Sequence, residues 1–205
     1  MSGFRIVVLA SGSGTNLQAI LDQLHGRDGI EVVGVGSDRP AARALERARA
    51  AGVATAAFPL AEHPDRGARD AALGDWIESL GADLVVLAGY MQLLSRDFVA
   101  RFRDRVVNVH PALLPRFPGL DAIGQALAAG VEVTGVTVHF VDECVDTGPA
   151  ILRREVPVPA GRDRAELEAA VHAVEHRLYP EAIRMLAEGR VRIEGNDRRT
   201  VVIDD

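Results

Sequence analysis

The chain has 205 residues, 48% of them hydrophobic and 25% charged, and a formal net charge of −6 at pH 7. These values are typical of a folded chain with a sizeable core, and the acidic balance argues against a general nucleic-acid binder. A single cysteine, Cys144, excludes an intramolecular disulfide and a cysteine-based zinc cluster, and the absence of lysine among the 23 basic residues excludes Schiff-base chemistry and a Walker phosphate loop.

The apolar run at residues 4–10 is too short for a secretory signal and indicates a first strand. No stretch approaches about 18 uninterrupted apolar residues, so the sequence predicts no membrane span. We therefore expect a soluble cytoplasmic protein that does not engage a membrane.

The first half of the chain alternates short, β-branched apolar runs with longer stretches rich in Ala, Leu, Arg and Glu. This alternation predicts a parallel sheet with helices on both faces, and strands without polar alternation fit burial on both sides. We expect strands at 4–10, 30–36, 53–58, 83–88 and 105–109, and helices near 15–25, 40–51, 66–80 and 95–103.

The pattern changes after residue 115, where a Pro- and Gly-rich loop begins. A long helix follows later at about 163–188, because apolar residues recur there at spacings of three and four. We expect the remaining elements to be a helix at 121–130, strands near 133–141 and 149–156, and a terminal hairpin of 191–193 with 200–203. The fold class is thus α/β, a doubly wound, mostly parallel sheet with C-terminal strands and a long C-terminal helix, in one domain, 1–205.

A glycine loop, Ser-Gly-Ser-Gly-Thr-Asn at residues 11–16, joins the first strand to the first helix. Gly12 and Gly14 allow the backbone to approach a ligand, and the helix N-terminus offers N–H groups to a phosphate. Thr15 and Asn16 are expected to cap the helix and to bond the phosphate. An ordinary capped turn is the alternative.

The sequence of this loop also narrows the class of phosphate ligand that it can bind. The third glycine of a dinucleotide fingerprint is replaced by Leu17, which favours a phosphomonoester over a nicotinamide dinucleotide. Asp38, after the second strand, is either an acidic ribose ligand or part of a turn with Arg39 and Pro40.

Asn108 and His110 stand two residues apart at the end of the fifth expected strand, just before Pro111. Their side chains therefore project to the same side. An amide beside an imidazole suits acyl transfer, since the amide stabilises a developing oxyanion and the imidazole exchanges protons. Asp146, in a polar turn, is a candidate carboxylate that tunes His110. The alternatives are structural: Asn108 satisfies backbone groups, and His110 is a partly buried histidine bonded to a carbonyl.

Four further segments carry a resemblance, together with the glycine loop and its continuation Leu-Gln. They read Leu-Ala-Gly-Tyr-Met at 87–91, Asn-Val-His-Pro-Ala-Leu-Leu-Pro at 108–115, Thr-Val-His-Phe-Val at 137–141 and Asp-Thr-Gly-Pro at 146–149. In this order the chain resembles the folate-dependent formyltransferases, and the Thr-Asn-Leu-Gln continuation is similar to their phosphoribosylglycinamide formyltransferase branch.

The resemblance implies transfer of a formyl group from 10-formyltetrahydrofolate to the amine of glycinamide ribonucleotide in purine synthesis, with no metal. It implies a Rossmann-like formyltransferase fold in which 1–110 is the phosphate-binding half and 111–205 the folate-site and C-terminal half. It assigns chemistry to Asn108, His110 and Asp146. The residues implied to bind the ribotide are Gly12, Gly14, Thr15, Asn16, His172 and Glu175. Those implied to bind the folate are Arg66, Met91, Gln92, Leu93, Leu94, Asn108, Asp142, Glu143 and Asp146.

Two positions depart from the family pattern. Gln92 stands where relatives often have arginine, and Asp121 stands where some members have a histidine. Both departures concern affinity more than reaction type. Small-molecule partners are implied, and the chain is expected to be a monomer or a homodimer.

Other readings of the chain remain open. His172, Glu175 and His176 match the inverted zinc-peptidase pattern, which requires a third ligand such as Glu194. The same site attacking with water gives a formyltetrahydrofolate deformylase; such relatives carry an extra N-terminal domain, whereas the first strand here begins at Phe4, which favours the transferase. A non-catalytic nucleotide-binding module leaves Asn108 and His110 unexplained.

Overall fold

A computed structural model describes residues 3–194 and 200–204. The chain divides into two compact units, Met1–Val107 and Asn108–Asp205. The boundary falls inside the strand β5, Val106–His110, three residues before the division at 110 expected from the sequence.

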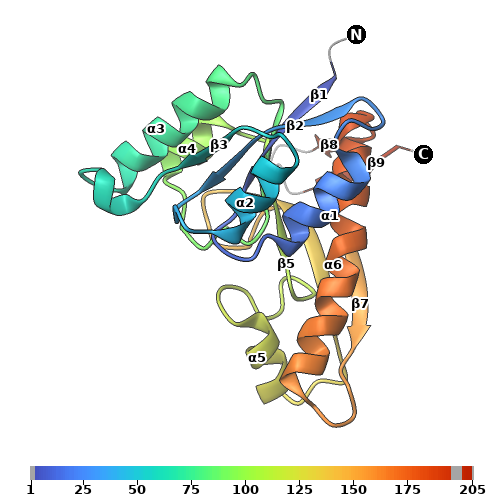
Figure 1. The fold of residues 1–205 in the computed structure, drawn as a ribbon. Coiled ribbons are helices and arrows are strands. Elements are labelled where there is room, and N and C mark those ends of the chain that lie inside the picture. Colours follow the sequence, from blue (N-terminus) through green and yellow to red (C-terminus); the bar gives the residue numbers. More distant parts are fainter. Residues whose placement is uncertain (1–2, 195–199, 205) are drawn as a thin grey trace. The chain divides into compact units, whose positions relative to one another are not determined.

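The first unit is built on parallel strands hydrogen-bonded in the order β3-β2-β1-β4, with the start of β5 next. Figure 1 labels β1, β2 and β3 of this sheet. Helices connect the strands, as the alternation of patterns predicted. The strands are β1 (Phe4–Leu9), β2 (Ile30–Ser37), β3 (Thr55–Ala57) and β4 (Leu84–Leu87). The helices are α1 (Thr15–Leu24), α2 (Arg43–Ala50), the 3-10 turn η1 (Leu60–Glu62), α3 (Arg66–Ser79) and α4 (Arg96–Arg101).

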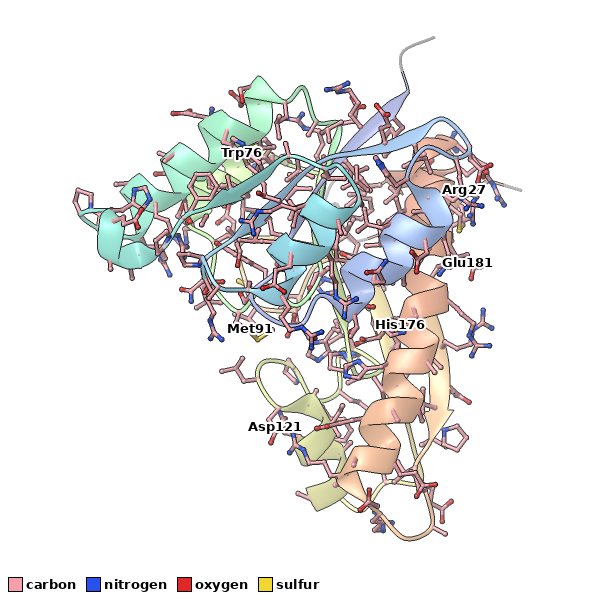
Figure 2. All side chains as sticks on the ribbon, in the orientation of Figure 1. Arg27, Trp76, Met91, Asp121, His176 and Glu181 are labelled. Atoms are coloured by element: carbon pink, nitrogen blue, oxygen red, sulfur yellow. The ribbon has the colours of Figure 1, made fainter. Side chains whose placement is uncertain are left out.

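Burial explains why these strands carry no polar alternation. Residues Ile6 to Ala10 are fully buried, and all four residues of β4 are buried. On β2, Gly34 and Gly36 allow α3 to pack closely, because a Cβ at Gly34 would lie 2.9 Å from the Trp76 ring. Trp76 points from α3 toward the sheet (Figure 2). The apolar runs therefore predicted the core of this unit.

Two elements are shorter than the sequence suggested. The strand expected at 53–58 spans only Thr55–Ala57. The helix expected at 40–51 begins at Arg43, because residues 39–42 form a turn in which the Ala42 N–H donates to the Arg39 carbonyl. The other expected elements agree to within two residues.

In the second unit, the end of β5 lies beside β6 (Val133–Phe140), and β6 pairs with β7 (Ala150–Pro157) in antiparallel register. A short helix α5 (Ala122–Ala128) precedes them. The long helix α6 (Arg164–Ala187) packs on β6 and β7, and it buries the predicted stripe at Leu167, Val171, Leu178 and Ala182. The expected terminal hairpin is confirmed as β8 (Val191–Glu194) with β9 (Thr200–Ile203). Among the described residues, no helix is both long and apolar enough to cross a membrane.

Candidate active site

Two histidine side chains of the second unit contact Asp146, and one of them also contacts Asn108. His110 ends β5 and is 4% exposed, and its Nδ1 lies 3.3 Å from Asp146 Oδ2. His139, near the end of β6, places Nε2 3.6 Å from Asp146 Oδ1 and 3.2 Å from Asn108 Nδ2. Asn108, His110, His139 and Asp146 therefore form one continuous polar cluster, named here the histidine cluster.

The carbonyl partners of the two histidines determine where their protons lie. Phe117 O is 2.8 Å from His110 Nε2, and Phe140 O is 2.8 Å from His139 Nδ1. A carbonyl only accepts, so each of these ring nitrogens carries a hydrogen. A neutral His139 then has a lone pair on Nε2, which accepts from the Asn108 amide. This bond directs the Nδ2 side of Asn108 into the cluster and leaves its second N–H available for a ligand.

Asp146 is fixed in the cluster by its backbone and by a loop. Its φ of 55° lies in the left-handed region, which aspartate tolerates better than most residues. The Gly119 N–H donates to Asp146 Oδ2 at 2.8 Å. Burial opposes its ionisation, but hydrogen bonding from His139 in its protonated form, the Gly119 bond and the charge of protonated His110 together lower the pKa of Asp146 below its ordinary value. The cluster thus holds a carboxylate, and its contact with His110 is direct.

The loop around Asp146 is internally bonded. Asp142 accepts from the Cys144 N–H and from the Thr147 hydroxyl, whereas Glu143 is exposed. Val145 is 50% exposed, and Leu120, next to the Gly119 that holds Asp146, is 81% exposed. Apolar side chains and carboxylates therefore flank the cluster at the surface of this unit.

The glycine loop of the first unit has a different cap from the one expected. Gly14, at φ 71°, is the N-cap of α1, and no side chain caps the helix. Thr15 is the first helical residue and the buried Asn16 the second, so the expectation that they cap the helix is wrong. Gly14 is required here because a Cβ would lie 2.8 Å from the Ala44 Cα.

A cation lies beside this loop, although sequence spacing gave no sign of it. Arg47 of α2 donates from Nε to the Ser13 carbonyl at 2.8 Å and from Nη1 to Gln18. The loop therefore combines a helix N-terminus, an open backbone position at Gly12 and a guanidinium, which suits an anion.

The segment after β4 places apolar side chains on the surface of the first unit. Met91 and Leu93 are 56% and 60% exposed, and Met91 projects outward in Figure 2. Leu94 is half-buried, and Gln92 is tied to neighbouring side chains. Arg66 is exposed at the first residue of α3. Asp38 is not a surface turn residue, since it is buried and accepts from Gln92 Nε2.

On α6, His172 Nδ1 lies 2.9 Å from Glu175 Oε2. The hydrogen bond to Glu175 raises the pKa of His172, whereas burial lowers that of His176. Within 3–194 and 200–204, no three metal-ligating side chains come together. Asp121, at the N-cap of α5, accepts from the Gly124 N–H and pairs with Arg164 at 2.7 Å.

The family model described as formyl transferase matches residues 4–183. The chain belongs to the formyl transferase family.

Similar members of the formyl transferase family include the phosphoribosylglycinamide formyltransferase of Haemophilus influenzae, 40% identical over 94% of this chain and 91% of that protein. That of Mycobacterium tuberculosis is 44% identical over 93% of this chain and 88% of that protein. The chain is also 40% identical to the bovine trifunctional purine biosynthetic protein adenosine-3, where 98% of this chain spans only 20% of the relative.

A solved structure of the family shares the fold. Glycinamide ribonucleotide transformylase 1 from Symbiobacterium toebii superposes with a TM-score of 0.95 at 52% identity, covering 100% of this chain and 95% of that one. The predicted α/β formyltransferase fold is thereby confirmed.

Sequence reasoning missed one member of the histidine cluster. His139 appeared only within the Thr-Val-His-Phe-Val segment and received no role, although it contacts both Asn108 and Asp146. The available signal was its position on a strand that leads directly into the turn containing Asp146. The structural alternative for His110 also holds in part, because it bonds the Phe117 carbonyl.

Proposed function

We propose that this formyl transferase family member transfers the formyl group of 10-formyltetrahydrofolate to the amine of glycinamide ribonucleotide in de novo purine biosynthesis. The observation that carries the proposal is the histidine cluster, which combines an oriented amide with an imidazole–carboxylate pair. The relatives that this chain matches along most of their length are phosphoribosylglycinamide formyltransferases.

In the proposed reaction, the amine nitrogen of the ribotide attacks the formyl carbon. A new C–N bond forms while negative charge develops on the formyl oxygen, where the free Asn108 N–H donates. The bond between the formyl carbon and N10 of the folate then breaks. The His110–Asp146 pair passes the proton that leaves the amine toward N10 through His110 Nδ1, because Nε2 donates to the Phe117 carbonyl, and the Asp146 carboxylate stabilises the imidazolium during the transfer. The products are formylated ribotide and tetrahydrofolate.

The ribotide phosphate is assigned to the glycine loop of the first unit. Its Gly12 and Gly14 backbone, the α1 N-terminus with Thr15 and Asn16, and Arg47 provide complementary charge. In the second unit, His172 and Glu175 are proposed to meet the glycinamide, with Glu175 accepting from its amine.

Substitution of the two glycines of this loop distinguishes an effect on ribotide binding from an effect on folding stability. A Cβ at Gly12 meets no atom within 4 Å, so Gly12→Ala should fold normally but raise KM for the ribotide about tenfold. Gly14→Ala introduces strain at positive φ and should lower the melting temperature as well. Steady-state kinetics with calorimetric melting measures both, and an unchanged ribotide KM in Gly12→Ala would remove the phosphate from this loop.

The folate is assigned to Met91, Leu93 and Leu94 as apolar walls with Gln92 at their centre. Arg66 provides a cation in the same unit. In the second unit, Asn108, Asp142, Glu143 and Asp146 complete the proposed set.

One assay tests the proposal against its nearest alternative. Purified protein is mixed with 10-formyltetrahydrofolate and glycinamide ribonucleotide, and tetrahydrofolate release is followed with and without the ribotide. We expect release only when the ribotide is present. Release at the same rate without it would assign a deformylase, and no release under either condition would favour a nucleotide-binding module.

We further propose a cytoplasmic enzyme that acts on small molecules as a monomer or homodimer and does not engage nucleic acid. Sedimentation across protein concentrations distinguishes the two assembly states.

A further inference from the structure

A buried ion pair lies on α3, and neither of its residues is among those assigned above. Arg69 is 0% exposed and its neighbour Asp70 is 1% exposed. Arg69 donates to Asp70 Oδ1 from Nε at 2.9 Å and from Nη2 at 2.6 Å. Desolvating two charges costs free energy that the pair recovers only with good geometry and additional bonds. Such a pair therefore contributes more to one defined conformation than to stability as such.

The additional bonds of this pair all reach one short segment, residues 92–95. Arg69 Nη1 donates to Gln92 Oε1 at 3.2 Å, and Nη2 donates to the Leu93 carbonyl at 3.3 Å. Asp70 Oδ2 accepts from the Ser95 N–H at 2.6 Å. Both charges of the pair are thus used to hold the backbone and one side chain of this segment.

The bonds continue beyond Gln92 to the end of β2. Gln92 Nε2 donates to Asp38 Oδ2 at 2.9 Å, so its amide accepts from a guanidinium at one end and donates to a carboxylate at the other. Glutamine satisfies both partners, whereas an arginine at 92 would place two guanidinium groups together. The cation beside Gln92 is therefore the Arg69 guanidinium of α3.

The segment is also fixed at its start. The Met91 N–H donates to Ser11 Oγ at 2.8 Å. Met91 and Leu93 nevertheless expose more than half of their side chains. Exposed apolar side chains on an anchored backbone are typical of a preformed binding surface. Arg66, three residues before Arg69 on the same helix, is exposed as well.

We propose that Arg69 is a positioning residue for the folate cosubstrate. Acting through Asp70 and Gln92, it fixes segment 91–94 relative to the N-terminal turn of α3, where Arg66 lies. The inference rests on the folate assignment proposed above. It goes beyond that assignment because Arg69 is itself too buried to touch the folate.

The main test is Arg69→Gln, which keeps a polar side chain but loses the charge and the forked geometry. We expect KM for 10-formyltetrahydrofolate to rise about tenfold, since charge-assisted bonds that position the segment are lost. KM for the ribotide should stay within about twofold, because the bonds of the pair reach residues 92–95 and not the phosphate-binding positions Gly12–Asn16. The matched control is Arg101→Gln. Arg101 of α4 pairs with Asp75 and Glu78 of α3, the helix that carries Arg69, but it makes no bond to segment 91–95, so both KM values should be unchanged.

Exchange of the two side chains provides a rescue. The double variant Arg69→Gln with Gln92→Arg retains one guanidinium and one amide between Asp38 and Asp70. It should recover part of the folate KM that Arg69→Gln loses. If Arg69→Gln does not fold, Arg69→Lys keeps the charge without the fork and should raise the folate KM by a smaller factor.

Hydrogen exchange provides a readout independent of turnover. The amides of residues 91–95 should exchange faster in Arg69→Gln, because Gln92 and the Leu93 carbonyl lose their bonds to Arg69, while exchange at Gly12–Asn16 stays constant. An unchanged folate KM in a folded Arg69 variant, or equal increases in both KM values without rescue by the exchange, would overturn the proposal. If the wild-type protein transfers no formyl group, the proposed function fails first, whatever the exchange rates show.

Discussion

The two units each bury a polar cluster around an aspartate, and the clusters differ in the protons they carry. In the first unit, Asp70 is bonded by Arg69, a group that stays charged at every working pH. In the second unit, Asp146 lies between His110 and His139, and an imidazole can both accept and donate a proton during catalysis. The first cluster is suited to holding a conformation, and the second is suited to moving a proton. A buried carboxylate alone therefore indicates little until its partners are known.

The largest expected effect is on kcat, and it should follow a substitution in the histidine cluster of the second unit. His110→Ala should lower kcat by about 10²- to 10⁴-fold, because it removes the group that exchanges protons with the reacting amine. The protein should still bind the ribotide, which calorimetry can measure. His25→Ala is the control: His25 accepts from the Val32 N–H, outside the histidine cluster, and its loss should leave kcat unchanged. Undiminished turnover in His110→Ala would assign the cluster a structural role.

The free energy of unfolding should respond most to a substitution in the Arg69–Asp70 cluster of the first unit. Asp70→Asn removes the charge that neutralises Arg69. The Ser95 N–H then faces either the amide NH2, which cannot accept, or the amide oxygen, which accepts more weakly than a carboxylate. Breaking a buried pair in this way should lower the free energy of unfolding by about 3 kcal/mol. On the same helix, Asp75 is 73% exposed, and Asp75→Asn should cost less than about 1 kcal/mol. Urea unfolding compares the two, and similar losses for both would mean that the buried pair is not specially coupled.

The dependence of stability on acid pH should reveal the charged contacts of Asp146 in the histidine cluster. Because the pKa of Asp146 is lowered from 3.8 in the folded state, its contribution is present above the unfolded value and is lost as pH falls through the folded one. The difference in unfolding free energy between wild type and Asp146→Asn should therefore shrink as pH drops below about 4. Denaturant titrations at successive pH values measure it. A difference that stays constant throughout the acid range would contradict the charged contacts.

Local pattern predicted the elements and the first two members of the histidine cluster. The buried runs of β1 and β4 and the apolar stripe of α6 carry their own periodicity, and Asn108 and His110 share a face by spacing alone. Asp146 rested on the resemblance, since nothing local places its turn beside β5.

What the sequence could not supply depends on partners distant in the chain. An arginine within a helix is ordinarily exposed, so the burial of Arg69 follows only from Asp70, Gln92 and the Leu93 carbonyl together. His139 lies on the strand β6, where seven of eight residues are buried, so no polar–apolar alternation marked it. Gly14, not Thr15, is the N-cap of α1, and the residue that excludes a Cβ at this position, Ala44, is remote in sequence.

The smallest expected effect concerns Tyr90, beside the first cluster. Its hydroxyl is buried without a hydrogen-bond partner within the described part of the chain, and burial raises its pKa to about 12. Tyr90→Phe removes this unsatisfied group and should change the free energy of unfolding by no more than about 1 kcal/mol, toward stability. The raised pKa also means that the unfolded chain releases the proton first, so wild type should lose stability as pH rises from about 10 to 12, and Tyr90→Phe should lose less. Unfolding at pH 7 and above pH 10 measures both effects. A clear loss of stability at pH 7 would instead show that the hydroxyl is bonded, for example to a buried water that extends the network of Asp38 and Arg69.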